Sequence, residues 1–143
     1  IKANCVLYAC RLSQIPRTTK EVADMFGIQC KDISRTTGIF TEIINDEKTE
    51  KNYITKPFNV MSRLLNTFDI SREERLKCNQ MCSKLEDCVD LMSKSPNSVA
   101  TAVIFMVMNK TLSKADICEK CSVSVPTLNK IVVLVKRHLE DNV

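Results

Sequence analysis

Apolar residues recur at helical spacing in two similar stretches of the chain, and a polar segment separates them. Residues 1–44 and residues 97–140 each read as three helices joined by short polar connectors. Ala3 through Tyr8 aligns with Ala100 through Phe105, and Ile33 aligns with Leu128. Such internal similarity predicts two copies of one helical unit.

Capping patterns support the same helix starts. In a Ser/Thr-x-x-acid pattern, each side chain can satisfy a free backbone N–H of the other residue. Ser124 followed by Pro126 predicts a further start, since proline is tolerated in the first helical turn. The patterns are Thr18–Glu21, Ser71–Glu74 and Ser113–Asp116.

The two units are predicted to be unequal. Residues 45–56 are polar and charged and read as a linker. A helix is expected from about Pro57 to Phe68 and a longer one from Ser71 to about Met92, so residues 57–143 form a five-helix unit. Residues 1–44 supply only the last three helices of such a unit. Because the opening helix is apolar on much of its surface, we expect residue 1 to lie inside a longer protein.

Composition narrows the class of protein. The 2 glycines and 4 prolines are too few for a turn-rich β fold, and 5% aromatics without Trp argue against a stacking platform for single strands. No apolar run in this sequence is long enough to span a membrane, and the polar residues near its start are not expected to form a signal peptide. The net charge of +4 is compatible with a polyanionic partner. One histidine and no glycine-rich phosphate loop predict a non-enzymatic protein without a cofactor.

The eight cysteines mostly occupy apolar positions of helical patterns, which favours free thiols in a reducing compartment over disulfides. Cys118-x-x-Cys121 invites a zinc interpretation, but structural zinc needs four ligands. His138 is the only histidine, and there is no second Cys-x-x-Cys. Core packing is therefore expected for this pair, and the same test applies to Cys78 and Cys82.

Three segments resemble a known family. The stretch from Ser95 to Met106 is similar to the Ser-Pro-x-Ser-Val-Ala-x-Ala-x-Ile-aromatic-Met signature in the second cyclin repeat of transcription factor IIB. The stretch from Cys5 to Glu21 resembles the matching part of the first repeat, and Phe58 to Arg63 resembles the start of the second. The resemblance implies an all-α fold of cyclin-like five-helix repeats, one complete and one lacking its first two helices.

The resemblance also implies a function. Members of this family are general initiation factors that bind promoter double-stranded DNA with TATA-binding protein and help recruit a multisubunit RNA polymerase. A monomer is expected, and a zinc ribbon is expected to precede this segment in the full-length protein. A cellular homologue would act in the nucleus, and a viral one in a cytoplasmic factory or virion. Two alternatives stay open: the related two-repeat factor of RNA polymerase III, and a cyclin-type regulator that binds a protein.

The last two helices of each unit predict helix-turn-helix motifs, in which the start of the second helix meets DNA. In the second unit the exposed candidates are Ser124, Thr127, Asn129 and Lys130. Asn can bond adenine in the major groove, and Lys130 can pair with phosphate. The family reads its upstream element with Val and Arg, where this chain has Pro126 and Asn129. Because the Arg is absent, contact with the DNA backbone is the expectation; the alternative is that all four are solvated turn residues.

The first unit offers a basic cluster around the equivalent turn. Phosphates or the acidic surface of a partner would suit such a cluster, whereas each charge alone fits a solvated surface equally well. As a group these residues are the stronger candidates for DNA contact. They are Arg17, Lys20, Lys31 and Arg35.

Overall fold

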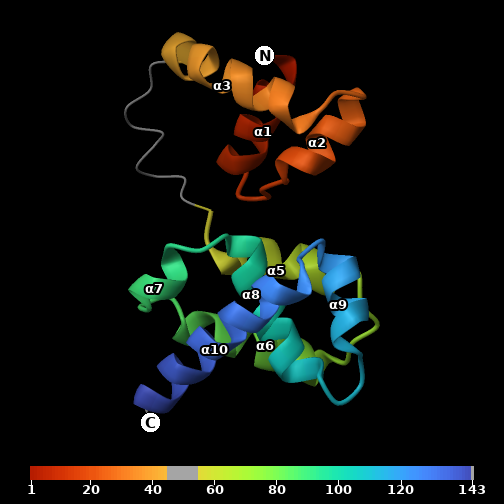
Figure 1. Cartoon of the computed structure of the whole chain (residues 1–143), viewed down its shortest axis with the longest axis vertical. Helices are drawn as coiled ribbons and strands as arrows, with labels where there is room; N and C mark the ends of the chain where they lie inside the picture. The colour runs from red at the N-terminus through yellow and green to blue at the C-terminus, as the bar shows by residue number, and fades with distance from the viewer. Residues whose placement is uncertain (45–54, 143) are drawn as a thin grey trace. The chain divides into compact units, whose positions relative to one another are not determined.

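A computed structural model describes residues 1–44 and 55–142, and every regular element in these ranges is an α-helix (Figure 1). The expectation of an all-α fold is confirmed. The chain divides into two compact units, Ile1–Thr55 and Lys56–Val143, which we describe separately. Apart from Thr55 and Lys56, the predicted linker over residues 45–56 lies outside the described residues.

The first unit contains the three helices predicted for residues 1–44. They are α1 (Lys2–Leu12), α2 (Thr19–Phe26) and α3 (Cys30–Ile44). Each helix packs against the other two. The buried cluster between them consists of Ala3, Leu7, Val22, Ala23 and Ile33.

A buried amide joins α1 to α3. Asn4 is only 4% exposed. Its Nδ2 donates to the Ile33 carbonyl oxygen at 3.3 Å and to Thr37 Oγ1 at 3.1 Å, while Thr36 Oγ1 donates to Asn4 Oδ1 at 2.7 Å. Because a buried polar group is costly without partners, these bonds make the α1–α3 pairing specific.

The second unit has one helix more than the sequence predicted. Its helices are α5 (Pro57–Leu65), α6 (Arg72–Lys84), α7 (Val89–Met92), α8 (Pro96–Met108), α9 (Lys114–Cys121) and α10 (Val125–Asp141). Together they bury one continuous core, with α8 in contact with α5, α6, α9 and α10.

The prediction of a single helix from Ser71 to about Met92 is wrong. The chain leaves the helix at Leu85 and restarts one turn later, with the Cys88 N–H bonded to the Leu85 carbonyl oxygen at 3.1 Å. Glu86 and Asp87 explain the break, since negative charge is unfavourable at a helix C-terminus and favourable before a helix N-terminus. The turn buries Leu85 and leaves Val89 81% exposed.

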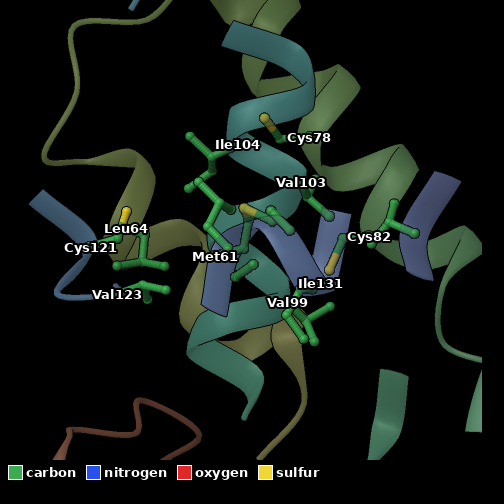
Figure 2. Packing of buried hydrophobic residues seen from close by; sticks show 14 of the residues in the cluster. Met61, Leu64, Cys78, Cys82, Val99, Val103, Ile104, Cys121, Val123 and Ile131 are labelled. Carbon is green, nitrogen blue, oxygen red and sulfur yellow. The ribbon is translucent and has the colours of Figure 1, made fainter. Parts of the chain in front are cut away.

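The central helix α8 is buried on nearly all sides. Every residue from Ser98 to Ile104 is buried. Figure 2 shows Val99, Val103 and Ile104 in the core cluster that also contains Met61 of α5 and Cys82 of α6. Small side chains such as Ala100 and Ala102 allow the surrounding helices to approach α8 closely.

The core of the second unit holds five of the eight cysteines, all free thiols: Cys78, Cys82, Cys88, Cys118 and Cys121. The core-packing prediction is confirmed for the Cys118–Cys121 and Cys78–Cys82 pairs. Burial raises the pKa of Cys78 to about 11 and the pKa of Cys82 to about 12, so both stay protonated near neutral pH. In the first unit, by contrast, Cys5 and Cys30 are exposed.

Candidate nucleic-acid interface

The turn between α2 and α3 has the same backbone geometry as the turn between α9 and α10. Gly27 ends α2 with φ 63° and ψ 33°, and Ser122 ends α9 with φ 55° and ψ 41°. The Ile28 N–H then bonds the Ala23 carbonyl oxygen at 3.0 Å, and the Val123 N–H bonds the Cys118 carbonyl oxygen at 3.0 Å. Each turn therefore closes with a left-handed residue and the backbone bonds of a Schellman-type end.

The helix starts are also matched. Thr18 Oγ1 accepts from the Glu21 N–H at 3.2 Å, and Ser113 Oγ accepts from the Asp116 N–H at 3.2 Å. The reciprocal bond predicted from the pattern is also present at the first position, where the Thr18 N–H donates to Glu21 Oε2 at 2.7 Å. At the second position Asp116 Oδ2 accepts instead from the Ser113 hydroxyl at 2.6 Å. Each motif thus has a capped first helix, a left-handed turn and a second helix.

Ser124 and Thr127 are engaged with each other at the start of α10. Ser124 is the N-cap residue, and its Oγ accepts from the Thr127 N–H at 3.4 Å. Their hydroxyl oxygens lie 2.7 Å apart and share a hydrogen bond. Both side chains are exposed, but their first structural role is to cap the helix.

Asn129 and Lys130 lie on the solvent face of α10. Pro126 and Val133 are also exposed, and their spacing places them along the same stripe. Leu128, Ile131, Val132 and Val135 form the opposite, buried stripe. The start of α10 therefore offers polar and basic side chains to a partner while the rest of the helix is anchored in the core.

Lys114, which no sequence pattern marks as a site residue, contacts Asn129 across the motif. Its Nζ donates to Asn129 Oδ1 at 2.8 Å and lies 5.1 Å from the ring centroid of Phe105. Because these residues belong to α9, α10 and α8, no spacing in the sequence reveals the contact. The helix-turn-helix pattern was the only available signal, since it places the start of α9 beside α10.

A second lysine fixes the other end of α9. Lys120 Nζ lies 5.1 Å from the ring centroid of Phe68 and donates to the Thr67 carbonyl oxygen at 3.4 Å. Cation–π contacts of this kind contribute roughly 0.5–1 kcal/mol each at exposed sites. The eight residues of α9 would be only marginally helical alone, so its packing and these two lysines define its position.

In the first unit the basic candidates form two pairs at helix starts. Arg17 and Lys20 flank the start of α2, and Lys31 and Arg35 lie one turn apart at the start of α3. Arg17 Nη1 lies 3.7 Å from Glu21 Oε1, and Arg35 Nη1 lies 3.9 Å from Asp32 Oδ1. These exposed ion pairs contribute little stability, so both guanidinium groups can exchange a carboxylate for a phosphate at small cost.

Within residues 1–44 and 55–142, no group of three or more His, Cys, Asp and Glu side chains could hold a metal ion. No helix in those ranges is long and apolar enough to cross a membrane.

No protein-family model matches the chain. It is similar to transcription initiation factor IIB of Encephalitozoon cuniculi, with 28% identity over 109 residues that cover 76% of this chain and 33% of the relative. The Xenopus laevis protein of the same name is 28% identical to this chain, and the match covers 80% of this chain and 35% of the relative. The Pyrococcus furiosus protein of that name is 26% identical to this chain, and the match covers 74% of this chain and 35% of the relative. The chain thus spans about a third of the length of these relatives.

All three relatives come from cellular organisms, and these matches give no support to a viral origin. The all-α fold, with its repeated set of three helices, fits the cyclin-like core that the sequence predicts. In fold, in motifs and in sequence, the chain is thus similar to the proteins named transcription initiation factor IIB.

Proposed function

We propose that this chain is the core of a general transcription initiation factor that binds promoter DNA together with TATA-binding protein and helps recruit a multisubunit RNA polymerase. It acts without catalysis and as a monomer, and in a eukaryotic cell it acts in the nucleus. The names of its relatives support the coarse function. The partners rest on the family resemblance and on the geometry of the two motifs.

The observation that carries the proposal is the repeated helix-turn-helix geometry with donor side chains at the start of each second helix. Lys31 and Arg35 occupy this place on α3, and Asn129 and Lys130 occupy it on α10. The positive end of a helix dipole favours phosphate, and side chains in the first turns can reach the DNA. A basic helix-turn-helix in both units favours DNA over a protein partner of the cyclin type.

An electrophoretic mobility-shift titration tests the proposal. The 143-residue chain is added to a promoter duplex with and without TATA-binding protein, at two salt concentrations. We expect a supershift only with TATA-binding protein, weakening at higher salt because phosphate contacts release counterions. No shift under any condition would sink the DNA-binding function and favour a protein-binding regulator.

Lys130→Ala is the test variant and Lys84→Ala the matched control, since each removes one exposed lysine. The Lys84 carbonyl oxygen lies 3.3 Å from His138 Nε2, so this residue is near the far end of α10. We expect Lys130→Ala to lower the slope of affinity against salt by about one unit and Lys84→Ala to leave it unchanged.

RNA polymerase specificity is tested separately. The supershifted complex is challenged with RNA polymerase II and with RNA polymerase III, and the enzyme that joins it is identified. Recruitment of polymerase II supports the general initiation factor. Recruitment of polymerase III alone would favour the related two-repeat factor.

A further inference from the structure

We propose that Lys114 is a positioning residue that makes Asn129 a hydrogen-bond donor toward DNA. In this assignment the start of α10 recognises acceptor atoms, either phosphate oxygens or the O6 and N7 edge of guanine, rather than adenine. The inference rests on the proposed function and specifies what one of its sites binds.

The first step is the orientation of the amide. Lys114 Nζ lies 2.8 Å from Asn129 Oδ1. An ammonium group has three donors and no acceptor, so only the oxygen of the carboxamide can face it. The Asn129 amino group is therefore directed away from Lys114, and its two N–H donors lie on the exposed surface of α10.

The second step is the fixed position of the ammonium group. Lys114 is the first residue of α9, directly after the Ser113 cap. Its Nζ also lies 5.1 Å from the Phe105 ring centroid, so α8, α9 and α10 all meet at this group. A lysine held by an aromatic ring and an amide loses less freedom on binding than a free surface lysine.

The third step is the effect on base choice. Asn recognises adenine by donating to N7 and accepting from the N6 amino group. Here the accepting oxygen already bonds an ammonium group, which would repel the positive edge of an adenine amino group brought to the same oxygen. Acceptor atoms of DNA, by contrast, are attracted by the positive charge of the Lys114 ammonium group. The adenine contact that the sequence suggested for Asn129 is thereby disfavoured.

Lys130 strengthens this preference. It is the exposed neighbour of Asn129 and adds a second ammonium group at the start of α10. The helix dipole is positive at this end. Phosphate and the guanine edge both offer only acceptors to such a cluster, and they differ in whether binding depends on sequence.

The experiment is a competitive selection on the 143-residue chain with TATA-binding protein, using duplexes randomised beside the TATA element. Wild type is compared with Lys114→Met, Lys114→Arg, Asn129→Asp and the control Lys84→Met. Thermal melting checks that each variant is folded. Asn129→Asp keeps a partner for Lys114 and replaces the donors by acceptors, so it tests the idea even if Lys114→Met unfolds.

We expect Asn129→Asp and Lys114→Met to weaken binding by roughly three- to tenfold, and Lys114→Arg and Lys84→Met to stay near wild type. Lys114→Met should also gain selection for adenine at one position, which a merely structural lysine would not alter. Guanine selection by wild type assigns the guanine edge. Equal selection of all bases, with loss of binding to methylphosphonate duplexes, assigns phosphate.

Adenine selection by wild type, or unchanged affinity in both Asn129→Asp and Lys114→Met, would overturn the inference and leave the proposed function intact. Failure of wild type to bind any duplex, with or without TATA-binding protein, would overturn both.

Discussion

Gly27 and Ser122 occupy the same place in the two helix-turn-helix motifs and adopt the same left-handed backbone conformation, although only one of them is glycine. Their φ angles are 63° and 55°. A side chain in this region costs roughly 1–2 kcal/mol because Cβ crowds the following carbonyl oxygen. At this turn the second motif therefore carries a backbone strain that the first motif avoids, although Gln14, outside the first motif, is also left-handed with φ 56°.

Gly27→Ala should lower the free energy of unfolding of the first unit by about 1 kcal/mol, because the alanine Cβ is sterically unfavourable at positive φ. Gly38→Ala is the matched control, because it lies within α3 at negative φ and should stabilise by roughly 0.5–1 kcal/mol. Neither added Cβ would meet an atom within 4 Å, so sterics do not confuse the comparison. Amide hydrogen exchange in α2 and α3 measures both; equal effects of the two changes would contradict the strain argument.

Ser122→Gly should stabilise the second unit by roughly 0.5–1 kcal/mol, since glycine adopts this conformation without the Cβ penalty. Chemical denaturation followed by circular dichroism measures the change. Ser83→Gly is the control, because this exposed serine lies inside α6, where glycine should instead destabilise. Destabilisation by both would show that the Ser122 side chain contributes more than its strain costs.

Asn4→Ala should destabilise the first unit by roughly 1–3 kcal/mol, because it removes the buried amide bonded to Ile33, Thr36 and Thr37. The free energy of unfolding, measured by denaturant titration with hydrogen exchange on α1 and α3, gives the value. Thr41→Ala is the control, since its exposed hydroxyl bonds only within α3, to the Thr37 carbonyl oxygen. If Asn4→Ala lowers the free energy of unfolding by no more than Thr41→Ala does, the Asn4 amide does not stabilise the first unit.

The cysteines should separate cleanly by reactivity. Cys5 and Cys30 are exposed and should react with iodoacetamide in the native protein, whereas Cys78, Cys82 and Cys121 should react only after unfolding. Mass spectrometry of peptides after timed alkylation reads out each site, and urea-unfolded protein serves as the control. Rapid native labelling of Cys82 would show that the second core opens locally.

Stability should also fall in alkali. The pKa of Cys82 is raised from 9.0 to about 12 by burial, so above pH 9.0 the unfolded state loses this proton before the folded state does. The contribution of this thiol is therefore complete below pH 9.0 and disappears as pH rises toward 12. Denaturation curves across this range should be less pH-dependent in Cys82→Ala than in wild type. The same dependence of stability on pH in both proteins would argue against a buried neutral thiol at Cys82.

The helices could be predicted from the sequence because local signals mark them. Thr18, Ser71 and Ser113 all cap their helices as their spacing predicted, and the first two form both reciprocal bonds of the pattern. The break after Leu85 was missed because apolar spacing continues through it, although the acidic pair Glu86 and Asp87 marks its place in the sequence.

The candidate site could be predicted in part, because the helix-turn-helix motif is also a local signal in the sequence. The motif places Asn129 and Lys130 at the start of the second helix, and the structure leaves both exposed. Lys114 could not be found this way, because its contacts join three helices that are separate in the sequence. The assignment of the eight residues to DNA binding stays a prediction.

A chain that carries the same trio of helices twice must keep the two copies from exchanging partners while it folds. Mispairing between similar repeats is a characteristic failure of such proteins. Asn4 and Thr101 occupy equivalent positions, but the threonine hydroxyl donates to the Asn97 carbonyl oxygen of its own helix at 2.6 Å, whereas the asparagine bonds three groups of α3. In the place of α8, α1 would bury an amide without those partners. One buried polar side chain thus makes the pairing of α1 with α3 more favourable than pairing of α1 with the helices of the second unit.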